Sequence, residues 1–183
     1  MEWIPGIKFI RSQNVWNDGL RLEDIACIST AIHQQMSGTI VKPGDILLNI
    51  TGASIGRSAI VPDDFDEGNV SQHVAIVRLA DKKIRRYLHI CLISPYIQNS
   101  IMGVQVGISR EGLSMKNLQD FIIPIPPLEE QRRIVARVDR LMSLCDKLEA
   151  GLMRSQADSE RLMEAVVGSM LAGGDGVEEH GAE

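Results

Sequence analysis

The sequence IPIPPLEEQRRIV, residues 123–135, separates two parts of the chain that differ in pattern. Its prolines lack a backbone N–H and cannot donate to a sheet ladder, so they suit a sheet edge or the exit from a domain. Pro127 then stands where the missing N–H costs a helix nothing, and two glutamates follow in the first turn, where the helix dipole favours acids. The stretch predicts that a globular domain, residues 1–126, ends here and that a long helix, residues 127–172, begins.

Apolar residues in this second part follow one another in alternating steps of four and three, the spacing of a coiled coil. A straight helix of about 45 residues would be roughly 65–70 Å long, more than the globular part can cover. Each fully buried aliphatic side chain contributes roughly 1.5–3 kcal/mol, so part of the stripe needs a partner helix. Ser155 and Ser159 weaken its middle. The predicted helix interface consists of Ile134, Val138, Leu141, Cys145, Leu148, Leu152, Leu162 and Val166.

The first part has the pattern of short strands broken by turns. Residues 7–10, 46–50, 58–61 and 74–77 are short apolar runs bounded by turn residues, which predicts strands. Lys-Pro-Gly-Asp at residues 42–45 places proline and glycine at the centre of a type II turn. Helical spacing follows, over residues 84–91 and near 96–102, with a break at a proline between the two. The expected fold class is therefore α+β, followed by a long coiled-coil-forming helix.

Composition excludes several classes of protein. The chain has 183 residues, of which 44% are hydrophobic and 23% charged, so it can bury a core and is not disordered as a whole. Its cysteines, Cys27, Cys91 and Cys145, form no CxxC pair, which argues against a disulfide framework and against a zinc finger. No apolar run approaches the roughly 18 residues of a membrane span, and no signal-peptide pattern opens the chain. We therefore expect a cytoplasmic protein without a membrane partner.

The net charge of −5 is unevenly distributed. Basic and acidic residues balance over residues 1–125, and the acidic excess lies in the remainder. Residues 173–183 carry acids without a lysine or arginine behind a glycine-rich opening, which predicts a disordered acidic tail. The rest of the chain is compatible with DNA binding without demanding it.

The loop TGASIGRS, residues 51–58, resembles a phosphate-binding loop but lacks its spacing. Three residues separate its glycines where a Walker A loop needs four, and Arg57 stands where that loop needs lysine, so nucleotide hydrolysis is not expected. A glycine-rich turn that presents Thr51, Ser54 and Arg57 suits contact with a nucleic-acid backbone or a base edge. A tight hairpin with an exposed arginine is the alternative interpretation.

Other polar residues in predicted loops form a second set of candidates. Asn and Gln can pair with adenine, and Arg with guanine, although residues of these types also cap turns or solvate a surface. The histidines do not cluster with Asp, Glu or Cys at metal-ligand spacing, and no nucleophile–base arrangement can be assigned. We expect neither an enzyme nor a metal site. The additional DNA-contact candidates are Asn14, Gln72, Gln105, Ser109, Arg110 and Lys116.

Several of these segments together resemble the DNA-specificity (S) subunit of type I restriction-modification systems, over about residues 6–170. The Pro-Pro-Leu-Glu-Glu-Gln-x-x-Ile-Val block is the most specific part of the resemblance, and KPGDIL is next. The segments that carry it are residues 42–49, 51–57, 71–73, 107–109 and 123–135.

This resemblance implies a mixed-sheet target recognition domain that reads one half of a split DNA sequence, followed by a conserved helix for dimerisation and methyltransferase docking. A complete subunit has two such units in tandem, with their helices antiparallel as a spacer. Here only one unit is present, so a half-length subunit, a natural split product or an excised fragment is expected. Such a chain could pair with a second copy or with another specificity half. S-adenosylmethionine and ATP would belong to the partner methyltransferase (M) and restriction (R) subunits, and this chain would need no cofactor. A coiled-coil assembly or antirestriction module that has lost DNA binding remains the alternative.

Overall fold

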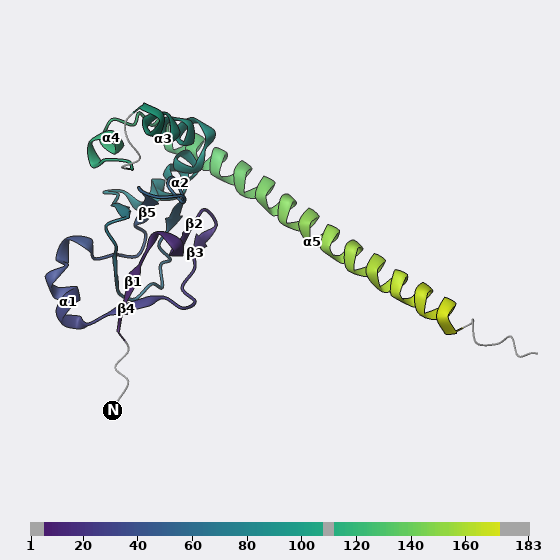
Figure 1. The fold of residues 1–183 in the computed structure, drawn as a ribbon. Helices are drawn as coiled ribbons and strands as arrows, with labels where there is room; N and C mark the ends of the chain where they lie inside the picture. The colour runs from purple at the N-terminus through teal and green to yellow at the C-terminus, as the bar shows by residue number, and fades with distance from the viewer. Residues whose placement is uncertain (1–5, 108–111, 173–183) are drawn as a thin grey trace, which may run out of the picture. The chain divides into compact units, whose positions relative to one another are not determined.

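The computed structural model describes residues 6–107 and 112–172 (Figure 1). The predicted contact residues Ser109 and Arg110 lie outside these ranges, as does the predicted disordered tail. The chain divides into two compact units, Met1–Val135, which we call the head, and Ala136–Glu183. The first turns of the long helix thus belong to the head, beyond the domain boundary that the sequence predicts.

A small mixed sheet forms one part of the head. Its central strand β1 (Ile7–Ile10) pairs antiparallel with β4 (Ala26–Ile28) and parallel with β7 (Gly68–Val70). The hairpin of β2 (Val15–Trp16) and β3 (Gly19–Leu20) follows β1 and packs against the second sheet. The strand predicted at residues 7–10 is confirmed, whereas β4 and β7 are too short to show a period of their own.

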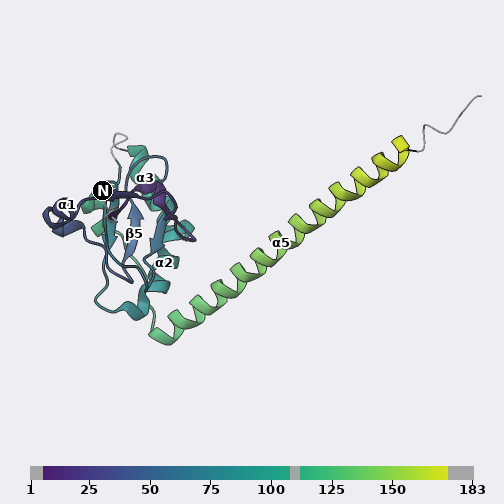
Figure 2. The ribbon, with the colours of Figure 1, turned by 90° about the horizontal axis from the view of Figure 1, so that it is seen from below.

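The second sheet is antiparallel and is centred on β5 (Ile46–Asn49), which lies between β6 (Ser58–Ile60) and β8 (Val74–Val77). Figure 2 shows β5 near the middle of the head. All of β5 is buried, and its side chains alternate between two apolar clusters. Leu47 joins the cluster that includes residues of β1 and β7, and Leu48 joins the cluster formed with α2 (Arg85–Ile93) and α3 (Pro95–Gly107). The predicted α+β class is confirmed.

Helices cover the second cluster and connect the strands. Leu88 and Leu92 of α2 pack with Ile97 and Ile101 of α3, and the expected break between the two helices falls at Ser94, whose hydroxyl donates to the Cys91 carbonyl at 2.6 Å. The remaining short helical elements are α1 (Thr30–Gln35), α4 (Met115–Gln119) and the 3₁₀ turns Ser12–Asn14, Ser37–Thr39 and Lys82–Ile84.

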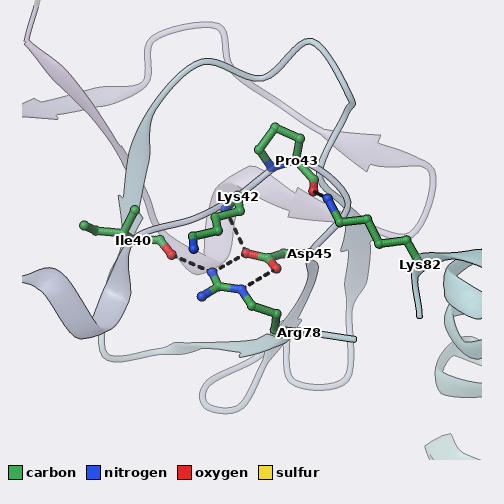
Figure 3. Close-up of polar contacts among 6 residues, drawn as sticks. All are labelled: Ile40, Lys42, Pro43, Asp45, Arg78 and Lys82. Atoms are coloured by element: carbon green, nitrogen blue, oxygen red, sulfur yellow. Dashed lines mark hydrogen bonds and ion pairs between the residues drawn. The ribbon is translucent and has the colours of Figure 1, made fainter. Parts of the chain in front are cut away.

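The turn at residues 42–45 is the type II turn that the sequence predicts (Figure 3). Gly44 has φ +82°, and the Asp45 N–H donates to the Lys42 carbonyl at 3.0 Å. The Asp45 side chain is only 3% exposed, and it accepts hydrogen bonds from the Lys42 N–H at 2.8 Å and from the Arg78 fork at 2.8 and 2.7 Å. Arg78 also donates to the Ile40 carbonyl, so this motif fixes the entry into β5.

The long helix α5 spans Leu128–Ala172, as the sequence predicts. Its start is held by Gln131, which is buried and donates to the Pro126 carbonyl at 2.7 Å. Along the predicted interface, Ile134 and Val138 are half-buried. The other predicted interface residues are exposed in the single chain, namely Leu141, Cys145, Leu148, Leu152, Leu162 and Val166. No helix among the described residues is both long and apolar enough to cross a bilayer.

Candidate nucleic-acid interface

The glycine loop, residues 50–57, joins β5 to β6 in a conformation closed by its own backbone. The Asn49 N–H donates to the Arg57 carbonyl at 2.8 Å, and the Gly56 N–H donates to the Asn49 carbonyl at 2.9 Å. Gly56 has φ +84°, and a Cβ atom there would lie 2.5 Å from Oε1 of Gln98. Gln98 in turn donates to the Gly56 carbonyl at 2.9 Å. These contacts hold the loop rigidly, so its outward side chains have defined positions.

Arg57 stacks on an aromatic ring at one end of the loop. Its Cζ atom lies 3.9 Å from the centroid of the Trp16 ring. The indole Nε1–H donates to the Gln13 carbonyl at 2.9 Å, and the neighbouring Asn17 accepts a hydrogen bond from the Ser58 N–H at 3.0 Å. The β2–β3 hairpin is therefore tied to the end of the glycine loop that carries the arginine.

Thr51 meets a second polar segment at the other end of the loop. Its Oγ1 lies 2.7 Å from Nδ1 of His73, and Gln72 Nε2 lies 3.5 Å from His73 Nε2. The Ile50 N–H donates to the His73 carbonyl at 3.0 Å, and the Ile50 carbonyl accepts from the Leu113 N–H at 2.7 Å. The structure thus brings two predicted candidates, Thr51 and Gln72, to one place, with His73 between them.

Ser54 is half-buried, and part of its hydrogen-bonding capacity is used inside the head. Its hydroxyl accepts a hydrogen bond from Asn49 Nδ2 at 3.1 Å, and the same amide nitrogen donates to the Ser12 carbonyl at 2.8 Å. Asn49 itself is fully buried. Ser54 therefore helps to hold the loop against the head through its hydrogen bond with Asn49.

Two other predicted contact residues with described side chains, Asn14 and Lys116, do not contact this loop. Asn14 is 3% exposed, and its amide is occupied by the Arg11 N–H and the Arg21 carbonyl, both at 2.9 Å. This arrangement supports the hairpin and leaves the Asn14 amide no atom for a ligand. Lys116 is exposed on α4, and no described hydrogen bond or ion pair joins it to the glycine loop. Gln105 is a residue of α3.

Trp16, His73 and Gln98 were not among the predicted contacts, although each positions the loop or its neighbours. His73 follows Gln72 directly and lies in segment 71–73 of the resemblance, and these were the sequence signals for it. Nothing in the sequence indicates the Trp16 stack, because it joins residues that lie far apart in the chain.

Titratable groups near the loop show no catalytic arrangement among the described residues. Burial lowers the pKa of His89, whose Nε2–H donates to the Ser58 carbonyl at 2.8 Å, so the imidazole is held neutral below β6. Burial also raises the pKa of the Cys91 thiol, which disfavours the reactive thiolate. Within residues 6–107 and 112–172, no group of three or more His, Cys, Asp or Glu side chains could hold a metal ion.

The fold and the loop surface define an α+β module that presents polar loop residues and continues into an amphipathic helix. A family model described as the type I restriction modification DNA specificity domain matches residues 5–154. The chain belongs to this family.

Curated relatives are similar over most of this chain. The specificity subunit of the type I restriction enzyme EcoBI from Escherichia coli is 32% identical over 172 residues, which are 92% of this chain and 35% of that protein. The MjaVIII specificity subunit of Methanocaldococcus jannaschii is 23% identical over 92% of this chain and 40% of its own length. The chain thus spans well under half of the length of these relatives.

Solved structures confirm the fold. The HsdS subunit of Thermoanaerobacter tengcongensis superposes with a TM-score of 0.68 at 23% identity, over 97% of this chain and 44% of that chain. A chain from a structural study of type I restriction-modification complex assembly gives a TM-score of 0.69 with the same identity and coverage. These two structures therefore share the fold of this chain.

Proposed function

We propose that this chain is a non-catalytic DNA-recognition subunit of a type I restriction-modification complex, in which the head reads one part of the target sequence. The match of the DNA-specificity family over residues 5–154 carries this proposal, because it includes the head and the first half of α5. The relatives that align over nearly all of the chain are named specificity subunits. The glycine loop contributes the chemistry, since its arginine and threonine can contact phosphate or base edges.

In this proposal the DNA-contacting surface consists of Thr51 and Arg57 at the two ends of the glycine loop, with Gln72 close to Thr51 through His73. Ser54 supports the same loop. Gln105, Ser109, Arg110 and Lys116 remain candidates at the periphery, whereas Asn14 is assigned to the support of the hairpin.

The partner subunits would supply the catalysis. M subunits would bind S-adenosylmethionine and methylate adenine, and R subunits would use ATP, while this chain would hold no cofactor. We expect the complex to act in the cytoplasm.

The helix α5 would join the head to a second specificity unit and to M subunits. Support comes from the exposed leucines of its predicted interface, because a stripe of this length loses much of its hydrophobic stabilisation in water. Two copies that pair antiparallel through α5 would be related by a two-fold axis, so the two halves of the recognised sequence would be palindromic. A second specificity half from another chain would instead give unrelated halves.

Analytical ultracentrifugation tests this pairing. We expect a dimer at micromolar concentration for the wild type and a monomer for Leu148→Glu, because a buried carboxylate opposes helix pairing. Lys147→Glu adds the same side chain next to this position on a charged face and should stay dimeric. A wild-type monomer would contradict pairing between copies.

A selection experiment tests DNA recognition itself. The purified protein is incubated with duplexes of randomised sequence, and bound duplexes are recovered, amplified and sequenced over several rounds. We expect one sequence to be enriched and its affinity to fall as salt rises, since phosphate contacts release counterions. Absence of enrichment, with or without M subunits present, would favour the coiled-coil assembly module instead.

A further inference from the structure

Two arginines lie against the ring of Trp16, and their surroundings differ. Arg21 lies 5.8 Å from the ring centroid, and its guanidinium is paired with Asp18 at 2.5 Å. Arg57 lies closer, at 3.9 Å, and no hydrogen bond or ion pair to its guanidinium occurs among the described residues. Among the described residues, the indole is therefore the main partner of the Arg57 guanidinium.

A guanidinium group can stack and donate hydrogen bonds at the same time. Stacking uses the flat face of the group, whereas its N–H donors point outward in the plane. At 3.9 Å the Arg57 Cζ is in face contact with the indole, so this side chain loses rotational freedom without losing its donors. Trp16 is itself held by the hydrogen bond to Gln13, and it remains 39% exposed, so the stack lies at the surface.

The backbone on both sides of the stack is also fixed. The Arg57 N–H donates to the Ser54 carbonyl at 3.1 Å, and the Asn17 side chain accepts from the Ser58 N–H. A donor fork that is oriented before binding loses less entropy when it meets a pair of acceptors.

We propose that Trp16 is a positioning residue that orients the Arg57 guanidinium for bidentate contact with an acceptor pair on DNA. This inference depends on the proposed function. It adds Trp16, a residue of the β2–β3 hairpin outside the glycine loop, to the reading surface. The acceptor pair is either a guanine edge or the oxygens of one phosphate, because both accept the same fork.

The test uses the full chain, the duplex that the wild type selects from the randomised pool, and a scrambled duplex of the same composition. Fluorescence anisotropy gives the Kd of each variant. Arg57→Ala should weaken binding to the selected duplex by about 5- to 150-fold. Trp16→Leu should weaken it by about 3- to 10-fold, because the guanidinium is still present but no longer oriented.

A double-mutant cycle separates positioning from a structural role. In the Arg57→Ala background, Trp16→Leu should cause no further loss of affinity, since there is no guanidinium to orient. Arg57→Lys keeps the charge but not the planar fork, so its affinity should lie between those of the wild type and Arg57→Ala. Arg21→Ala is the matched control on the same ring, and its Kd should stay within about 2-fold of the wild type because Asp18 already occupies this arginine.

The outcomes distinguish this inference from the proposed function. Losses confined to the selected duplex identify a guanine edge, and equal losses on both duplexes identify a phosphate; both support the role of Trp16. If the wild type selects a sequence and Trp16→Leu binds that sequence with wild-type affinity, the positioning role of Trp16 is overturned and the proposed function is not. An equal loss from Trp16→Leu with and without Arg57 would also overturn the positioning role, and a wild type that selects nothing would remove the proposed function first.

Discussion

Replacing Asp45 by alanine removes the carboxylate that ties the turn before β5 to Arg78 (Figure 3). The Asp45 side chain is 3% exposed, and its removal would leave the Lys42 N–H, which donates to it at 2.8 Å, without this partner. Such a loss costs about 1–3 kcal/mol. The Arg78 side chain is 46% exposed, so water can replace its two charge-assisted hydrogen bonds to Asp45. Their loss therefore costs only about 1 kcal/mol in total. The expected decrease in the free energy of unfolding is about 2–4 kcal/mol.

Urea unfolding followed by tryptophan fluorescence measures this loss in the head, where Trp16 lies, without the strong helical signal of α5. Asp63→Ala is the matched control. Asp63 accepts a similar fork from Arg85, at 2.6 and 2.7 Å, but is 69% exposed, and its removal should cost much less. A change below about 0.5 kcal/mol for Asp45→Ala, or equal changes for the two variants, would refute the reasoning that burial makes this pair important.

Two further predictions concern the residues that support the glycine loop. Gly56→Ala should lower the free energy of unfolding by about 2–3 kcal/mol, because φ is +84° and the new Cβ would displace Gln98. The control Gly52→Ala, at φ +75° but with open space around it, should lower it by only about 1 kcal/mol. Equal losses for the two variants in thermal unfolding would contradict this prediction. Because the pKa of His89 is lowered in the folded protein, the unfolded chain protonates His89 at a higher pH than the folded chain does. The contribution of neutral His89 to stability is therefore present above about pH 6.5 and decreases as the pH falls below it. His89→Gln keeps a donor for the Ser58 carbonyl without the titration, and urea unfolding between pH 5 and 7 should show a smaller decrease than in the wild type; parallel curves would exclude His89 as the cause.

Local patterns were sufficient to predict the elements that have them. β5 is a continuous apolar run behind a Pro-Gly turn, and α5 carries a heptad pattern behind a proline and two glutamates, so both are predicted within a few residues of their ends. β4 and β7 have three residues each, too few for a period, and the parallel pairing of β7 with β1 depends on chain segments about 60 residues apart. The head extends to Val135, beyond the predicted boundary, and the burial of Gln131 in this segment could not be read from its residue type.

The site was predicted in part for the same reason. The glycine loop is a local motif, so Thr51 and Arg57 could be selected from sequence. Asn14 has the residue type of an adenine reader, but its amide is buried between Arg11 and Arg21, and burial cannot be read from residue type. Trp16 and Arg57 lie far apart in the sequence, and only the fold brings their side chains into contact.

Sequencing of the DNA methylome tests most directly the claim that this chain decides which sequence its complex recognises. The comparison uses cells with the gene, without it, and complemented with the wild type or with Arg57→Ala. We predict that methylated adenines at one split motif disappear without the gene and return with the wild type, and that Arg57→Ala reduces or relaxes methylation at that motif. An unchanged methylome in all four cell lines would contradict the account.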